Sequence, residues 1–379
     1  MKKKNILYLS PSNRWLGARI SLYVLLKRLD KERFHPIIVC PSPDGDFAQK
    51  LEEAGFEVIY LRLWNWRKYK YIIHRTLSVL NLRKIIKEKK IDLIHCNEFW
   101  TAPYAYWSSR GMNIPLVSHV RLDMNQKKIK NYYLNKLTRI ICVCKALVEK
   151  FSLLKDYRRR VVPIYNAINL AEYDPEKVNA DHLYEKFNVN RDHLLIGLIA
   201  QISVRKGQDR LIRISPEIIK RHPEVRFLIV GGSREKEYEE KIHRMIRELG
   251  VGEHFIFTGQ QDDMPAIYQI LDIMVLPSQM EGFGRVAVEA QAMKVPVVVS
   301  KAGGLVEVVN PGATGYHFAL DSDDEMLKRL LTLAGDPELR QKMGEAGRDL
   351  VKRKFSQEIM VEQVHELYRE VLKNGSGNK

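Results

Sequence analysis

Two glutamates in the second half of the chain have the types and the spacing of a binding site. Seven residues separate Glu281 from Glu289, and the turn between them contains Gly282, Phe283, Gly284 and Arg285. An apolar run, residues 273–276, precedes this segment and a helical pattern follows it, so we predict a strand, a turn and a helix. The free N–H groups at the start of such a helix bind phosphate, and carboxylates accept strong hydrogen bonds from hydroxyl groups. The segment predicts a phosphate site with one carboxylate for a sugar and one for a ribose. The alternative is a strand, turn and helix with solvated glutamates.

Two cations follow another apolar run in the same half. Arg205 and Lys206 stand before Gly207 and soon after residues 194–199, which we predict to form a strand. Cations at the end of a strand, opposite the helix start described above, can hold a diphosphate. The alternative is that both are ordinary surface charges.

The first half contributes a histidine at the end of a predicted strand. His119 closes the apolar run 115–119, and Arg121 follows it. An imidazole there can hydrogen-bond a sugar hydroxyl or act near a reacting centre. Arg121 is a second candidate for the same cleft, and His95 and Asn97 end another strand nearby. The alternative is a histidine at the end of a strand whose hydrogen bonds are satisfied within the protein and which has no functional role.

The surroundings of the two glutamates resemble family 4 of the retaining glycosyltransferases. Glu281 and Glu289 match its E-x7-E signature, with Pro277 and Ser278 before the first glutamate. The later segments that fit the family are residues 296–299, 302–304 and 312–315 together with Glu307. The resemblance covers nearly the whole chain. It implies a GT-B fold, catalysis without a metal or other cofactor, and retention of the anomeric configuration.

The resemblance also implies roles for the residues of the second half. It implies that Glu281 contacts the hydroxyls of the donor sugar and that Glu289 contacts the ribose. Lys206 matches the lysine that binds the diphosphate and stabilises the leaving group. The family usually has an arginine where this sequence has Gln201, and whether Arg205 compensates is an open question.

In the first half, the family has a glycine-rich loop after the first strand, and a backbone N–H of this loop contacts the donor phosphate. Gly17 matches that loop, but Ala18 stands where a second glycine is common. The resemblance also implies a functional histidine at the position of His119.

Apolar runs alternate with longer amphipathic stretches in both halves of the chain. The runs are residues 6–9, 36–40, 58–61, 91–95, 115–119, 140–143, 194–199, 226–232, 254–257, 273–276 and 295–299. This alternation is typical of parallel sheets with helices on both faces. We therefore predict two Rossmann-like α/β domains that face a central cleft, as in GT-B proteins.

The pattern lapses near the middle of the chain and sets the predicted boundaries. We expect an acceptor-binding domain over residues 1–165, a linker over 166–189 and a nucleotide-sugar domain over 190–355. Residues 356–379 are predicted to form a helix that crosses back to the first domain and then a frayed tail.

The charge of the chain is unevenly distributed. The chain carries a net charge of +16, and residues 1–165 hold 33 basic and 13 acidic side chains, whereas the remainder holds 29 and 33. An excess of this kind indicates an anionic partner for the first half. Arg67, Lys68 and Lys70 alternate with aromatic residues, a mixture that suits a membrane interface or an acidic acceptor. A buried helix with a solvated basic face is the alternative.

The remaining features favour a protein of the cytoplasm, with a peripheral position on the inner face of the cell membrane as an option. No apolar run approaches the length of a membrane-spanning helix, and the apolar part of the N-terminus is too short for a signal peptide. The four cysteines form no disulfide framework, and no metal-ligand cluster completes Cys142 and Cys144.

We therefore predict an enzyme that moves a hexose or related sugar from a nucleoside diphosphate sugar to a lipid-linked or envelope glycan, such as lipopolysaccharide or a glycolipid. Its catalytic residues would be His119, Lys206 and Glu281. An epimerase or phosphorylase with the same fold is one alternative. A basic nucleic-acid-binding protein is another, but the sequence has no recognisable nucleic-acid module.

Overall fold

The computed structural model describes residues 3–15 and 17–375, and the chain divides into two compact units. The first unit is formed by Met1–Ala167 and Gln357–Lys379, and the second by Ile168–Ser356. Of residues 166–189, which the sequence predicts to be a linker, residues 166–167 belong to the first unit, and residues 168–189 belong to the second unit and include helix α8 (Asp181–Lys186).

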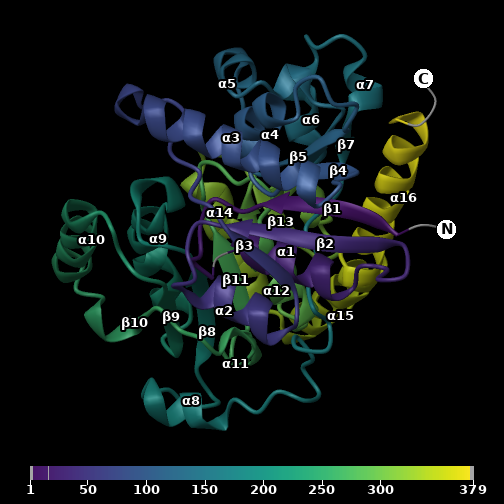
Figure 1. The fold of residues 1–379 in the computed structure, drawn as a ribbon. Helices are drawn as coiled ribbons and strands as arrows, with labels where there is room; N and C mark the ends of the chain where they lie inside the picture. Colours follow the sequence, from purple (N-terminus) through teal and green to yellow (C-terminus); the bar gives the residue numbers. More distant parts are fainter. Residues whose placement is uncertain (1–2, 16, 376–379) are drawn as a thin grey trace. The chain divides into compact units, whose positions relative to one another are not determined.

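The first unit is built on a seven-stranded parallel sheet (Figure 1). The strand order is β3-β2-β1-β4-β5-β6-β7. The strands are β1 (Lys4–Leu9), β2 (Phe34–Cys40), β3 (Glu57–Tyr60), β4 (Leu93–Cys96), β5 (Leu116–Val120), β6 (Arg139–Cys142) and β7 (Val161–Pro163). The helices are α1 (Gly17–Lys27), α2 (Asp46–Glu53), α3 (Ile72–Glu88), α4 (Ala102–Ser108), α5 (Gln126–Asn131), α6 (Lys145–Val148), α7 (Tyr157–Arg160) and α16 (Gln357–Gly375). Most strand residues are buried, as expected where helices cover a parallel sheet.

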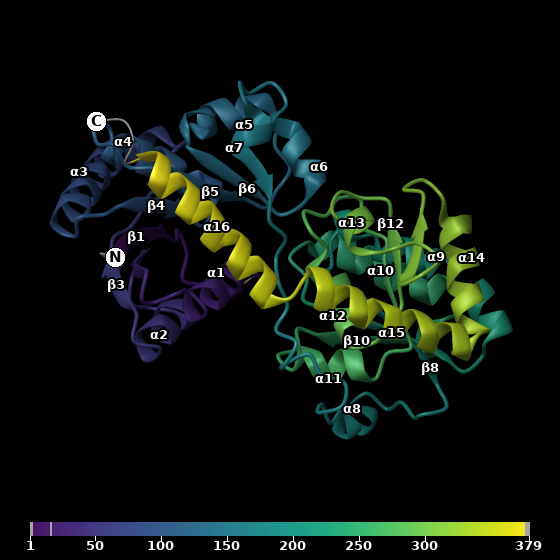
Figure 2. The same cartoon turned by 90° about the vertical axis from the view of Figure 1, so that its right-hand side faces the viewer.

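The core of the first unit includes the last helix of the chain. One cluster of buried residues joins the strands to α1, α2 and α16, and Figure 2 shows α16 in yellow beside α1. The residues that α16 contributes are Met360, Val361, Val364, Leu367, Tyr368 and Val371. Thus two distant stretches of sequence share one hydrophobic core.

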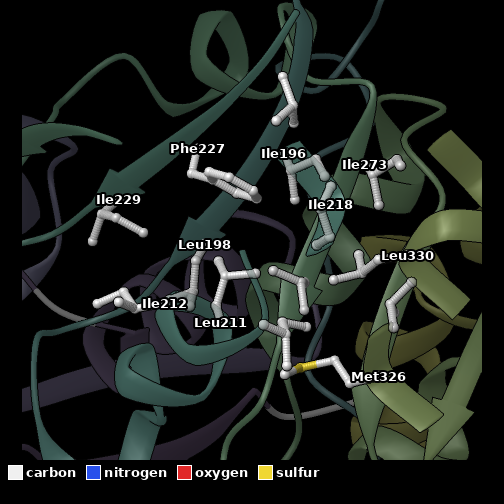
Figure 3. Packing of buried hydrophobic residues seen from close by; sticks show 14 of the residues in the cluster. Ile196, Leu198, Leu211, Ile212, Ile218, Phe227, Ile229, Ile273, Met326 and Leu330 are labelled. Atoms are coloured by element: carbon white, nitrogen blue, oxygen red, sulfur yellow. The ribbon is translucent and has the colours of Figure 1, made fainter. Parts of the chain in front are cut away.

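The second unit has a six-stranded parallel sheet in the order β10-β9-β8-β11-β12-β13. The strands are β8 (Leu194–Ile199), β9 (Val225–Val230), β10 (Phe255–Gly259), β11 (Ile273–Leu276), β12 (Val297–Ser300) and β13 (Gly315–Phe318). The helices besides α8 are α9 (Gln208–Arg221), α10 (Lys236–Glu248), α11 (Met264–Gln269), α12 (Arg285–Ala292), α13 (Leu305–Val308), α14 (Asp323–Ala334) and α15 (Pro337–Lys354). Figure 3 shows the core on one side of this sheet, where Phe227 and Ile196 meet Ile218 of α9 and Leu330 of α14.

Strand order reverses once in each sheet. In the second unit the chain moves outward from β8 through β9 to β10, then returns to the other side of β8 with β11. The same reversal separates β1 from β4 in the first unit. Loops diverge at such a point, and ligands of open α/β sheets bind beyond the carboxyl ends of the strands there.

Candidate active site

Arg205 and Lys206 lie on the loop after β8, and Glu281 lies on the neighbouring loop after β11, at the reversal point of the second sheet; Glu289 follows in helix α12. The loop after β8 contains a short 3-10 helix, η5 (Val204–Lys206), and the loop after β11 leads to α12. Gln279 N–H donates to the carbonyl of Arg205 at 2.9 Å, which ties the two loops together through their backbones. The structure therefore brings Lys206 and the E-x7-E segment to one place.

Lys206 and Glu281 form an ion pair between these loops. The Lys206 ammonium donates to Glu281 Oε1, and both side chains are largely buried. The buried Ser278 hydroxyl also donates to this oxygen, at 3.2 Å. An ammonium has three donors and a carboxylate about four lone-pair sites, so both groups keep capacity for a ligand.

Glu289 lies in the second turn of α12 and is held from two sides. Tyr268 of α11 donates to its Oε2 at 2.8 Å, and Arg285 Nε donates to its Oε1 at 2.6 Å. Burial raises the pKa of Tyr268 well above its usual value, and the Glu289 charge adds to the shift, so this phenol is a donor. Arg285 Nη1 is buried without a hydrogen-bond partner among the described residues. The carboxylate is thus fixed in place, and it retains lone pairs.

Two glycines allow close packing around the turn before α12. Gly284 caps α12 at φ 83°, and a Cβ there would meet Leu305 Cδ2 at 2.4 Å. Gly303 has φ 51°, and its Cβ would lie 2.0 Å from the Glu281 carbonyl oxygen. Gly304 N–H donates to that same oxygen at 3.0 Å. The position of Glu281 therefore depends on a glycine turn from the next strand.

Other residues predicted at the donor site have different surroundings. Phe283 is buried edge-on against Phe355, 5.6 Å between ring centroids, which indicates a packing role. Gly282 is half-buried beside it, with its carbonyl close to Gly304. Arg205 and Gln201 are exposed, and the Gln201 carbonyl accepts from Gln208.

The candidates in the first unit gather at the ends of β4 and β5. His95 Nε2 lies 2.7 Å from His119 Nδ1, and the two rings stack at 4.8 Å. The hydroxyl of Tyr368, from α16, hydrogen-bonds the other nitrogen of His95, and lies 3.1 Å from the hydroxyl of Tyr8 in β1. His119 is therefore one end of a buried chain of hydrogen bonds that spans three strands and the last helix.

Burial determines the charge of the two histidines in this series of hydrogen bonds. It lowers the pKa of His95 from 6.5 to about 3, with a further contribution from the nearby Arg121 charge. Burial followed by the Arg121 charge also holds the pKa of His119 well below 6.5. Both imidazoles are therefore neutral near pH 7. A neutral His119 can accept or donate one hydrogen bond at its remaining nitrogen.

Arg121 follows β5 and Gly17 follows β1, and these two strands lie on either side of β4 in the same sheet. Arg121 donates to the carbonyl of Asn97 and, at 3.2 Å, to its Oδ1, and its Nε is buried without a partner among the described residues. Gly17 is the first residue of α1 and has open space around it. Next to it, Arg19 pairs with Glu98 after β4.

Sequence reasoning missed three supporting residues. Ser278 stands out in the sequence only as part of a motif, and neither Tyr268 nor Tyr368 carries a local signal, because each reaches its partner from a helix that is distant in sequence. Across the described ranges, no group of three or more His, Cys, Asp or Glu residues is placed to hold a metal ion. In the same ranges, no helix is long and apolar enough to cross a membrane.

Both units match models of known families. A model of group 1 glycosyl transferases matches residues 180–350, and a model of glycosyltransferase family 4 matches residues 15–172. The chain belongs to family 4 of the glycosyltransferases. Its two parallel-sheet units are those of the GT-B fold.

Individual relatives of this glycosyltransferase are distant. The capsular polysaccharide biosynthesis glycosyltransferase CapM of Staphylococcus aureus is 26% identical over 72% of this chain and 74% of its own. A GDP-mannose-dependent phosphatidylinositol monomannoside mannosyltransferase of Mycolicibacterium smegmatis is 32% identical over 48% of this chain and 49% of its own. Among solved structures, HepE of Anabaena in complex with UDP superposes with a TM-score of 0.83 at 22% identity, over 97% of this chain and all of HepE.

The close approach of Gly303 to the carbonyl oxygen of Glu281 leads to a prediction about stability. Replacement of a left-handed glycine by alanine costs roughly 1–2 kcal/mol through the backbone alone. Gly312→Ala, at φ 79° with no atom within 4 Å of the new Cβ, should show that cost only. Gly303→Ala should destabilise the protein clearly more, because its Cβ meets the Glu281 carbonyl. Thermal unfolding measures the stability of both variants. Equal unfolding midpoints would contradict the idea that the close approach of Gly303 to Glu281 excludes a side chain.

The buried histidines predict a pH-dependent stability. Unfolding returns their pKa values to about 6.5, so the unfolded state binds more protons below that pH and the native state loses stability. Each histidine should cost about 1 kcal/mol between pH 6.5 and 5.5. All five tryptophans, Trp15, Trp64, Trp66, Trp100 and Trp107, lie in the first unit, so tryptophan fluorescence during urea unfolding reports on it. His95→Gln should flatten the slope, whereas His74→Gln, at an exposed position of the same unit, should not. Equal slopes in all three proteins would contradict the prediction.

Proposed function

We propose that this protein is a retaining glycosyltransferase that moves a hexose or related sugar from a nucleoside diphosphate sugar to an acceptor glycan. The observation that carries the proposal is the pairing of Lys206 with the E-x7-E segment at the reversal point of the second sheet. A cation, a helix start and two carboxylates there match the phosphates, the sugar and the ribose of such a donor. HepE, which shares the fold, has been solved with UDP and with UDP-glucose.

In this proposal Lys206 and the N–H groups at the start of α12 stabilise the departing diphosphate. Oriented donors of this kind contribute most where charge develops in the transition state. Arg205, exposed beside Lys206, supplies a second cation in place of the one absent at Gln201. Glu281 binds hydroxyls of the transferred sugar and Glu289 binds the ribose. The acceptor attacks the face from which the diphosphate leaves, and that phosphate takes the acceptor proton. No metal is required.

The first unit is proposed to bind the acceptor. Its neutral His119 offers a hydrogen bond to a sugar hydroxyl, and Arg121 adds a cation for an acidic group. CapM is named for capsular polysaccharide, and the mycobacterial relative for a mannosylated phosphatidylinositol. Together with the basic first unit, these names favour an envelope glycan or a glycolipid, made by a cytoplasmic enzyme at the inner face of the membrane.

An epimerase or a phosphorylase of the same fold would also bind a phosphorylated sugar. Neither is favoured by the E-x7-E segment, and product analysis separates the three reactions. A nucleic-acid-binding protein would show a steep salt dependence of oligonucleotide affinity.

The role of Glu289 predicts a change in donor affinity. Glu289→Gln removes the charge that accepts the ribose hydroxyls, and hydrogen bonds to charged groups are worth about 1.5–3 kcal/mol. The donor KM should rise at least about tenfold, with a smaller change in kcat, because the contact exists before and during the reaction. Tyr268→Phe is the control, since it removes a partner of Glu289 but not the carboxylate; its donor KM should stay near that of the wild type. A folded Glu289→Gln protein with unchanged KM would remove the proposed role.

Two properties of the wild-type reaction test the mechanism. A thermal-shift screen of sugar nucleotides first identifies the donor, which stabilises the folded state. Transfer from that donor should continue in excess EDTA, because Lys206 and the start of α12 supply the positive charge. NMR of the product should show the anomeric configuration of the donor. Loss of activity that Mg²⁺ or Mn²⁺ restores, or an inverted product, would overturn the mechanism.

A further inference from the structure

A hollow lies beyond the carboxyl ends of β1, β2 and β3 in the first unit. Its volume is about 640 Å³, and its walls come from the segments after these strands together with the turn before α3. It is separate from the chain of histidines at β4 and β5. The lining residues that matter for binding are Arg14, Arg62, Lys68, Asp44, Asp46 and Trp64.

The lining has the chemistry of a site for an acidic sugar. Carboxylates and amides, from Asp44, Asp46 and Asn13, can bond sugar hydroxyls, and the Oδ1 of Asn13 is buried with no hydrogen-bond partner in the part of the chain that the structure describes. Three cations outnumber the two carboxylates, which leaves positive charge for an acidic substituent. Arg62 already stacks on Trp64, 4.1 Å from the ring, so its guanidinium is oriented before any ligand arrives. Lys68 is exposed.

Helix α3, next to the hollow, is apolar on two sides. One side carries the buried residues Ser78, Leu82 and Ile86 and belongs to the fold. The other side is exposed, although it is also apolar. Its residues, with those of the preceding 3-10 helix η1 (Tyr69–Tyr71), are Tyr69 (87% exposed), Ile72 (56%), Ile73 (71%), Leu77 (54%) and Leu80 (56%).

Basic residues frame this exposed face at both ends. Lys68 and Lys70 precede α3, and Lys84 and Lys87 lie in its later turns. A contiguous apolar patch with cations at its rim is typical of a surface that lies on an anionic bilayer, because the lipid headgroups attract the basic residues.

The hollow and the face meet at one turn. Lys68 and Tyr71 line the hollow, while Tyr69 and Ile72, their neighbours in sequence, belong to the exposed face. We propose that this turn joins two parts of one acceptor site: α3 lies on an anionic membrane, and the hollow takes the acidic sugar head of a lipid in that membrane. The proposal rests on the proposed function and adds to it the chemical class of the acceptor and the place where it binds.

Two variants separate the two parts of the site. The double variant Ile73→Glu/Leu77→Glu should lower binding to phosphatidylglycerol vesicles at least about tenfold, because it places charge on the face that meets the lipid. Leu153→Glu is the matched control, since Leu153 is a 77% exposed leucine of the same unit away from α3. Wild-type protein should sediment with phosphatidylglycerol vesicles at low salt, leave them at high salt, and ignore phosphatidylcholine vesicles.

The hollow is tested with soluble probes: an oligosaccharide that contains glucuronic acid, a hexose phosphate, and a neutral oligosaccharide. Lys68→Gln should weaken the acidic probes by roughly tenfold, as expected for the loss of a charge-assisted hydrogen bond, and leave the neutral probe unchanged. The α3 double variant should bind all three probes like the wild type. Binding of either acidic probe that depends on Lys68 supports the site, and the two probes distinguish a carboxylate from a phosphate.

Three results would overturn the proposal. The first is a wild-type protein that does not bind anionic vesicles at low salt. The second is equal affinity of the wild-type protein for acidic and neutral probes. The third is a dimer that forms through α3 and that the double variant abolishes. Thermal stabilisation by the donor, measured on the same proteins, tests the proposed transferase function separately from the proposed acceptor site. If the donor still stabilises the protein after one of these results, only the acceptor site is refuted.

Discussion

The chemistry of this protein depends on a constraint of parallel sheets, namely that neighbouring loops diverge only where strand order reverses. At β8 and β11 this geometry places an ion pair, Lys206–Glu281, between loops that are also joined by a backbone hydrogen bond. At β1 and β4 it allows buried polar groups from three strands and α16 to meet. Each unit therefore gathers these polar groups at the carboxyl ends of its strands, while the rest of the sheet lies in an apolar core.

The polar side chains at the candidate sites differ in charge between the two units. In the second unit each glutamate of the E-x7-E segment is matched by a cation from the same unit, Glu281 by Lys206 and Glu289 by Arg285. In the first unit burial keeps His95 and His119 neutral beside a charged arginine. Fixed charges suit the phosphates of a donor, whereas neutral imidazoles can contact hydroxyl groups without a large cost of desolvation.

Local sequence signals predicted much of this arrangement. Apolar runs separated by helical stretches indicated two parallel-sheet units, and glycines beside Glu281 indicated a turn with unusual backbone angles, because both signals act over a few residues. Contacts over long separations were not predictable. Tyr368 reaches His95 from 273 positions away, and the exposure of Ile73 and Leu77 depends on which side of α3 packs, which the apolar pattern alone does not decide. The motif predicts Phe283 at the donor site, but the edge-on contact of its ring with Phe355 depends on packing that the motif does not reveal.

The place of α16 has a consequence for synthesis on the ribosome. The first unit is the first to emerge, but six residues of its core lie between Met360 and Val371, at the far end of the chain. The second unit is contiguous, so it has all of its residues before the first unit can complete its core. The nascent first unit therefore exposes an uncovered apolar surface on α1 and the sheet until α16 has been synthesised. A nonsense mutation before α16 therefore removes part of the core of the first unit, although the second unit is encoded in full.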